Sequence, residues 1–492
     1  MKQFTDRIKK RIMSDEIFRC SIIAVLLLLF AYLIKAVGWK EFWYDEVATI
    51  GYVRNGLSLW DVLHYYQTIE VTNLPLYAVI EYFFYHFFPP EDIWLLLPGI
   101  LMTLAGVALL VRLADKVGGR RMAYVVLLMS VLSTTVINRM ALELRAYALL
   151  FLASVLVLSC LYQYKDKFST GGLITTSVAM IILAYSHYFG ILFLAVLGIG
   201  VLVDIIKNKK GWKRFLPFLI AAGAFLPWFY MAMKNSRINT GEFWIAPPGI
   251  KELLETVGYL LGGNYLLCVL YGIGFLWLLY DIFKSKQLFS FQTVYALAGP
   301  VVMAVVFIYS RWINPAGGLY ENRYFLVILP CVLLTTAYGV ERLVTVFQGK
   351  VGKIISVVML LYFTAACLLL GRRSLMDSRG QYARYSYAAD YIISENELAK
   401  DDVLLICSSY DDVGQVVLEG WYDYYLLRRG FVAENFRMGK ENSLDRLLAD
   451  EKEYRKIYVV GDTDRITYEG DIYKIVLQDF FFKLTVLEKS DD

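Results

Sequence analysis

Two adjacent carboxylates, Asp45 and Glu46, follow the aromatic stretch Phe42-Trp43-Tyr44 and come shortly after an apolar run from Ser21 to Val37. A positioned carboxylate can act as a general base that takes the proton of an attacking hydroxyl group. Ionisable residues at membrane depth cost roughly 2.5–3.5 kcal/mol each, so this pair is a candidate for function. The alternative interpretation is that both residues lie in water and stabilise the N-terminus of the next helix.

Six other residues could take part in chemistry: Asn73, Glu143, Arg145, His187, Tyr188 and Arg323. A guanidinium group binds phosphate oxygens in a bidentate manner, so Arg145 and Arg323 are candidates for holding a phosphate. Each residue also has a structural interpretation: an ion pair between loops for Glu143 and Arg145, or a helix anchor for Arg323. The candidate ligands for a divalent metal are Asp45, Glu46, Glu143 and His187. Ligand geometry does not follow from sequence, so the metal question stays open.

The composition is typical of a polytopic α-helical membrane protein. Hydrophobic residues make up 58% of the 492 residues, charged residues make up 19%, and the mean hydropathy is +0.51. Runs of about twenty apolar residues are long enough to cross roughly 30 Å of hydrocarbon. We expect about eleven transmembrane helices, at 17–37, 93–113, 122–138, 146–163, 171–186, 189–206, 215–233, 264–283, 289–309, 324–345 and 354–370.

The topology depends on the apolar segment 74–88, which rises only about 22 Å as a helix and is too short to span the hydrocarbon core. We interpret it as an amphipathic helix along the outer face of the membrane. The N-terminus and the basic loops are then cytoplasmic, in agreement with the positive-inside rule. These loops are Arg112–Arg121, Lys165–Lys167, Lys207–Arg214, Lys284–Lys286 and Arg342–Lys353. The expected location is therefore the plasma membrane, in a multi-pass arrangement.

Two domains are expected. Residues 1–373 form the transmembrane module, and its outer loop 38–92 carries interfacial helices. Residues 374–492 alternate between helical and strand patterns, with strands at 403–406 and 456–460 and a final pair near 472–476 and 483–487. This alternation predicts a small extracytoplasmic α/β domain. Because no glycine-rich phosphate loop follows either of the first two strands, no nucleotide is assigned to it.

In their order along the chain, these segments resemble the GT-C class of membrane glycosyltransferases. The resemblance is greatest to bacterial relatives of the protein O-mannosyltransferases and of the aminoarabinose transferase. It covers roughly residues 17–370 and begins with the first span and the Asp45-Glu46 pair in a long outer loop. Asn73-Leu74-Pro75-Leu76-Tyr77 is similar to the family's His-Pro-Pro-Leu-Tyr, with Asn73 and Leu74 in place of its His and first Pro. The other matching segments are Arg139 through Tyr147, His187-Tyr188 and Glu321 through Phe325.

The resemblance implies a polyprenyl-phosphate monosaccharide as donor and sugar transfer on the outer face. The reaction would pass through an oxocarbenium-like state. The departing phosphate is already an anion, so it needs a cation rather than an acid, and this role fits Arg145 and Arg323. Asp45 is the expected base and Glu46 its supporting neighbour, and a single base without a partner acid predicts inversion at the anomeric carbon. The acceptor is a glycolipid, a polymer or a protein, and no nucleic acid is expected.

Two other classes of function fit parts of the sequence. A secondary transporter or lipid flippase would bind its substrate near the middle of the membrane on broken helices. A non-catalytic scaffold would present the outer domain. The spans after the first have few acidic residues at their centres and the polar groups gather on one side, which favours chemistry at one surface.

Overall fold

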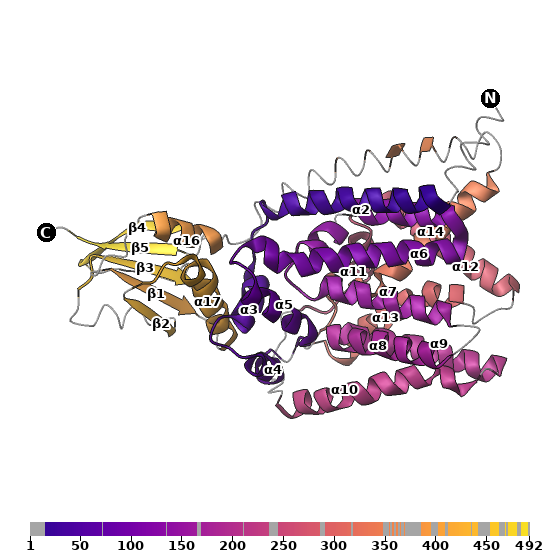
Figure 1. Ribbon diagram of the computed structural model, residues 1–492, viewed down its shortest axis with the longest axis horizontal. Coiled ribbons are helices and arrows are strands. Elements are labelled where there is room, and N and C mark those ends of the chain that lie inside the picture. Colours follow the sequence, from indigo (N-terminus) through magenta and orange to yellow (C-terminus); the bar gives the residue numbers. More distant parts are fainter. Residues whose placement is uncertain are drawn as a thin grey trace. The chain divides into compact units, whose positions relative to one another are not determined.

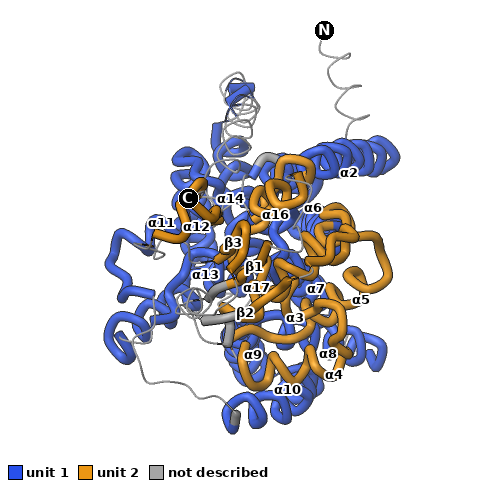
Figure 2. The backbone as a smooth tube through the Cα atoms, turned by 90° about the vertical axis from the view of Figure 1, so that its left-hand side faces the viewer, with its two compact units in different colours: residues 1–36, 97–374 blue, residues 37–96, 375–492 orange. Residues whose placement is uncertain are grey.

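The computed structural model divides the chain into two compact units, coloured separately in Figure 2. Unit 1 comprises residues 1–36 and 97–374, and unit 2 comprises residues 37–96 and 375–492. The structure describes residues 15–490 except 71, 134, 165–168, 210, 236–244, 286–290, 316–317, 348–353, most of 355–384, 395–401, 409–411, 434, 441–452, 462–467, 469–470 and 480–483.

Unit 1 is helical, and its elements are labelled in Figure 1. Its α-helices are α2 (Asp15–Val37), the larger part of α6 (Asp92–Leu132), α7 (Tyr147–Gln163), α8 (Thr170–Ser186), α9 (Tyr188–Asn208), α10 (Leu216–Asn235), α11 (Ile250–Leu260), α12 (Tyr265–Ser285), α13 (Phe291–Ile308) and α14 (Leu329–Val346). Shorter elements are the π-helices η1 (Thr135–Ala141) and η3 (Tyr309–Ile313) and the 3₁₀-helices η2 (Trp212–Arg214) and η4 (Asn322–Ile328).

Within the described residues, seven helical segments are long and apolar enough to cross a membrane. They are Asp15–Val37, Asp92–Val131, Tyr188–Asn208, Trp212–Lys234, Tyr265–Lys284, Phe291–Ile313 and Asn322–Val346. Helices α7 and α8 are apolar but shorter. The expected count of eleven spans is therefore not confirmed, and the expected span 354–370 lies mostly outside the described residues.

Helix α6 contains a break that accounts for part of this difference. Two spans were expected here, at 93–113 and 122–138, whereas the structure has one continuous assignment interrupted by Gly119, whose φ of 83° and ψ of −178° are not helical. Glycine adopts positive φ without the steric penalty of a side chain. The 41 residues would rise about 62 Å as one helix, roughly twice the thickness of the hydrocarbon core.

Several of the predicted basic loops meet at one end of unit 1. Arg120, beside Gly119, pairs with Asp15 at the start of α2. Arg121 lies 3.3 Å from Glu341, and the adjacent Arg342 pairs with Asp281 near the end of α12. Such pairing requires the predicted loops at 112–121 and 342–353 to lie on the same side of the bundle. The structure thus agrees with a shared side for these loops, and their cytoplasmic location stays a prediction.

Unit 2 combines the segment 37–96 with the C-terminal α/β elements. The segment folds into α3 (Tyr44–Val53), α4 (Leu59–Thr68), α5 (Leu76–Phe87) and the start of α6. The C-terminal part contains α16 (Tyr385–Ser394), α17 (Asp412–Tyr425), the 3₁₀-helix η5 (Leu427–Arg429) and five strands: β1 (Val403–Ser408), β2 (Phe436–Lys440), β3 (Lys456–Gly461), β4 (Tyr473–Asp479) and β5 (Leu484–Lys489). Helix α5 matches the expected short helix, and its place at the membrane interface stays a prediction.

The strands form one mixed sheet in the order β2-β1-β3-β5-β4. Strand β1 is parallel to β2 and β3, whereas β5 is antiparallel to β3 and β4. Alternate residues of β1 and β3, such as Leu405 and Val459, point to the same face and pack with Leu487 in a buried cluster. The expected strands are present, and β2 is an additional strand.

Helix α3, which begins at the candidate pair Asp45-Glu46, is packed closely against α17. All its residues from Glu46 to Val53 are buried. The two helices meet at Gly51 and Gly420, where a Cβ atom added to Gly420 would lie 2.5 Å from the Cα and N atoms of Gly51. Only backbone occupies this contact, so no side-chain rotation could make room for a larger residue.

We expect Gly420→Ala to lower the free energy of unfolding. Overpacking costs typically about 1–3 kcal/mol, and a backbone clash lies at the upper end, which exceeds the roughly 1 kcal/mol that alanine gains over glycine in a helix. The thermal unfolding midpoint of the protein in lipid nanodiscs would measure the change. Gly272→Ala in α12, where an added Cβ meets nothing within 4 Å, is the matched control and should be neutral or stabilising. An unchanged midpoint for Gly420→Ala would contradict this contact.

Candidate functional site

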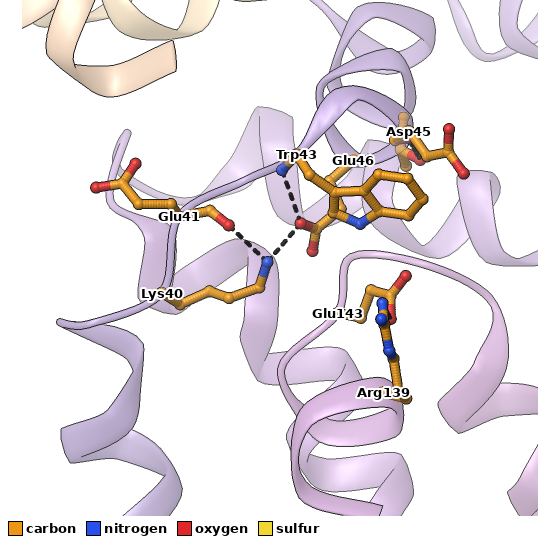
Figure 3. A network of polar contacts seen from close by, with 8 residues as sticks. Lys40, Glu41, Trp43, Asp45, Glu46, Arg139 and Glu143 are labelled. Atoms are coloured by element: carbon orange, nitrogen blue, oxygen red, sulfur yellow. Dashed lines mark hydrogen bonds and ion pairs between the residues drawn. The ribbon is translucent and has the colours of Figure 1, made fainter. Parts of the chain in front are cut away.

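One group of candidate residues lies in unit 1 just before α7. Arg139 belongs to the π-helix η1, and Glu143 follows it in a bend. The Nη1 atom of Arg139 lies 3.3 Å from Oε2 of Glu143, whose side chain is only 2% exposed (Figure 3). A buried carboxylate without a cation is costly, so the pairing with Arg139 explains how Glu143 is kept inside the protein.

His187 forms the joint between α8 and α9 and is 5% exposed. Its Nδ1 atom accepts a hydrogen bond of 3.1 Å from the backbone N–H of Phe189, which caps α9 and leaves the proton of a neutral ring on Nε2. Burial, together with the guanidinium groups of Arg145 and Arg323, lowers the pKa of His187 to about 3. The imidazole is therefore neutral at physiological pH and lies within the electrostatic reach of both candidate phosphate-binding arginines.

Tyr259, in α11, connects this group to the Glu321–Tyr324 segment. Burial raises the pKa of the Tyr259 hydroxyl group. The positive charges of Arg139 and Arg323 oppose this increase, whereas the negative charges of Glu143 and Glu321 add to it. In that segment, Arg323 Nε lies 3.8 Å from Glu321 Oε1. The ring of Tyr324 lies 5.1 Å from that of His187.

Unit 1 therefore brings together four residues that the sequence indicated separately: Glu143, Arg145, His187 and Arg323. Tyr188 follows as the first residue of α9 and is half-buried. The group lies at the end of α9 opposite to the basic residue Lys207, about 30 Å away along the helix. The candidate residues thus gather at the end of α9 away from Lys207.

In unit 2, Asp45 and Glu46 occupy the first turn of α3 but have different surroundings. The Glu46 side chain is fully buried, lies 2.5 Å from Lys40 Nζ and accepts a 3.0 Å hydrogen bond from the backbone N–H of Trp43. Glu46 therefore caps the helix, as the alternative interpretation proposed. Asp45 is half-buried, and Figure 3 shows its carboxylate pointing away from Lys40 and Glu46. The two neighbouring carboxylates thus differ in burial and in direction.

Asn73 is held within the loop between α4 and α5. Its Nδ2 atom donates a 2.7 Å hydrogen bond to Oε1 of Glu70, which also accepts from the Thr72 hydroxyl at 2.6 Å. The other carboxylate oxygen of Glu70 accepts from Tyr52 at 2.9 Å. Asn73 thus helps to fix this loop.

Lys40 and Tyr259 are neighbours of the candidate residues that the sequence did not single out, whereas Arg139 was expected as part of the Arg139–Tyr147 segment. Lys40 and Glu46 are six residues apart, and no periodicity connects a residue before a helix with one inside it. Among the residues that the structure describes, no cluster of three or more histidine, cysteine or acidic side chains could hold a metal.

Two solved structures have the same fold as this chain. Both are crystal structures of ArnT from Cupriavidus metallidurans, a GT-C aminoarabinose transferase. The structure with bound undecaprenyl phosphate aligns with a TM-score of 0.59 and 14% identity, covering 96% of this chain and 98% of that chain. The apo structure aligns with a TM-score of 0.55 and 14% identity, covering 95% of this chain and 97% of that chain. No protein-family model matches the sequence, and no curated protein sequence matches it significantly. The resemblance stated from sequence is therefore confirmed as a shared fold.

We expect the His187→Asn variant to lose less stability in acid than the wild-type protein does. The folded state disfavours the charged imidazole, whereas the unfolded chain binds a proton near pH 6.5. The contribution of the neutral imidazole to the free energy of unfolding is therefore complete above about pH 6.5. It falls as the pH drops toward 3, and roughly 2 kcal/mol of it is lost at pH 5. Asparagine can still accept from the Phe189 N–H but does not titrate.

The measurement is the difference in thermal unfolding midpoint between pH 7.5 and pH 5, which should be smaller in His187→Asn than in the wild type. His64→Gln, at an exposed position of α4, should keep the wild-type difference. Equal differences in all three proteins would show that the buried imidazole does not titrate as described.

Proposed function

We propose that the protein is a GT-C glycosyltransferase that moves a monosaccharide, a hexose or a pentose, from a polyprenyl-phosphate carrier to an acceptor on the outer face of the plasma membrane. The observation that carries the proposal is the fold. It is shared along 96% of the chain with an ArnT structure that contains undecaprenyl phosphate. The acceptor is a glycolipid, an envelope polymer or a protein.

Arg145 and Arg323 are assigned to the donor phosphate. Both act on the same buried imidazole, His187, so two guanidinium groups converge on one region of unit 1. A polyprenyl phosphate becomes a better leaving group when its developing charge is neutralised, and bidentate guanidinium contacts do this efficiently. A neutral His187 adds no third positive charge, but it can donate a hydrogen bond from Nε2.

Asp45 is assigned as the base that takes the proton of the acceptor hydroxyl group. Glu46 does not compete for this role, because its carboxylate is already paired with Lys40 and bonded to the N-terminus of α3. Its contribution is to hold the first turn of α3, where Asp45 lies. With one base, the acceptor attacks the anomeric carbon from the face opposite to the phosphate, and the configuration inverts.

The position of the candidate groups at one end of unit 1 favours this proposal over a transporter. Glu143, His187 and Arg323 lie at helix ends or in connecting segments. A transporter would place equivalent groups near the centre of the membrane, on interrupted helices. A reaction at the surface requires only that the lipid headgroup and the acceptor reach one end of the bundle.

We expect Asp45→Asn to reduce kcat for sugar transfer by about 10²–10⁴-fold, because the amide cannot accept the proton. The assay uses the purified protein in membranes that contain a labelled polyprenyl-phosphate sugar, with extracts of the native envelope as the source of acceptor. Glu91→Gln, an exposed carboxylate of the same segment, should retain wild-type activity. Full transfer by Asp45→Asn would remove Asp45 as base, and a product with retained configuration would exclude single displacement.

We expect Arg145→Lys and Arg323→Lys each to raise the donor KM by about tenfold or more. Lysine keeps the charge but cannot form the planar bidentate contact with phosphate oxygens. Titration of the labelled donor at saturating acceptor measures the change. Arg112→Lys, an exposed arginine of α6, is the matched control. If KM stayed at the wild-type value in both variants, the phosphate would have to bind elsewhere.

A further inference from the structure

The C-terminal α/β elements hold the segment 37–96 at several points along α3. Before the helix, the Ser386 hydroxyl in α16 donates a 2.7 Å hydrogen bond to Oε2 of Glu41. In its last turn, the backbone of Gly51 lies directly against that of Gly420. Beyond its end, Arg54 pairs with Glu419 of α17. Helix α3 is thereby held before its start, in its last turn and beyond its end by residues more than 300 positions later in the chain.

Asp423 of α17 is the centre of these contacts. Its carboxylate accepts 2.9 Å and 3.1 Å hydrogen bonds from the backbone and side-chain nitrogens of Asn55, just after α3. It also accepts a hydrogen bond from the hydroxyl group of Tyr85 in α5. Asp423 is 5% exposed and Tyr85 is fully buried. One carboxylate therefore ties the end of α3 to α5.

Arg428 supplies the positive charge for this arrangement. Its guanidinium group lies 4.2 Å from the centre of the Tyr85 ring and donates a 2.8 Å hydrogen bond to the carbonyl oxygen of Phe88 at the end of α5. A buried carboxylate with three hydrogen bonds and a nearby guanidinium has little freedom to reorient. The contacts thus define both the position and the direction of α3.

We propose that Asp423 is a positioning residue for sugar transfer: through Asn55 and Tyr85 it sets the orientation of α3 and hence of the Asp45 carboxylate. This inference rests on the proposed function of Asp45. It gives the C-terminal elements a role in the reaction without contact with the reacting atoms. Because a misplacement of about 1 Å can reduce a rate by about 100-fold, loss of these hydrogen bonds should affect kcat strongly.

The test compares Asp423→Asn with two further variants in the full-length protein. In Asp423→Asn, the amide nitrogen cannot accept the hydrogen bond that the carboxylate oxygen receives, so kcat should fall by about 10–100-fold. The donor KM should stay within about twofold of wild type, since the phosphate is assigned to other residues. Tyr85→Phe removes only one hydroxyl group and should reduce kcat by a smaller factor. Combining Tyr85→Phe with Asp423→Asn should give less than the product of the two single effects.

Asp402→Asn is the matched control for a merely structural role. Asp402 is equally buried in the same unit, and its carboxylate is held by Arg455 and the Lys456 N–H at the sheet. Its loss should lower the unfolding midpoint but leave kcat unchanged at temperatures where the protein is folded. Amide hydrogen exchange within α3 should increase in Asp423→Asn and not in Asp402→Asn.

The outcomes separate this inference from the proposed function. A wild-type protein that transfers no sugar from the polyprenyl-phosphate donor would remove the proposed function and this assignment with it. An active wild type with an unchanged kcat in Asp423→Asn and Tyr85→Phe would overturn the positioning role alone. Equal losses of kcat in Asp423→Asn and Asp402→Asn would also overturn it, because stability would then explain both.

Discussion

The cost of burying a charge is the constraint on which the polar structure of this protein depends. An ionised carboxylate cannot leave water without a cation or several hydrogen-bond donors. Glu46 has Lys40 and the Trp43 N–H, Glu143 has Arg139, and Asp423 has Asn55 and Tyr85. The partners of Glu46 and Glu143 are near them in sequence, whereas Asp423 connects segments more than 300 residues apart. Asp45, in the same first turn of α3 as Glu46, is only half-buried, and its carboxylate points away from Lys40 and Glu46.

Much of the fold follows from the sequence, because apolar runs and strand patterns are local signals. The helices of unit 1 lie close to the expected ranges, and the strands β1, β3, β4 and β5 lie where alternation predicts them. Strand β2 was missed because Phe436-Arg437-Met438-Gly439-Lys440 has few β-branched residues and includes a glycine. A loop was expected around Gly119, whereas in the structure Gly119 is the residue of α6 whose φ and ψ are not helical.

For the candidate site, the sequence identified the residue types but not their partners. The sequence predicted Arg145, His187 and Arg323 on one side of the membrane, and the influence of both arginines on the His187 imidazole appears only in the structure. The capping role of Glu46 was one of two open alternatives, and its hydrogen bond from the Trp43 N–H, together with its pairing with Lys40, supports this role. Asn55 and Asp423 are 368 residues apart. No local pattern connects them, so the link between the candidate base and the C-terminal elements required three-dimensional information.

Unit 2 consists of two segments that are far apart in the chain, and this has a consequence for how the protein is synthesised. Residues 37–96 leave the ribosome before residues 97–374, and only then do residues 375–492 appear. At about 5–20 residues per second, the early segment waits roughly 15–60 s for its partner. During that time α3, which is buried from Glu46 to Val53 in the finished protein, has no α17 to cover it. Biogenesis therefore includes an interval in which an apolar helix must be shielded by the membrane surface or by a chaperone.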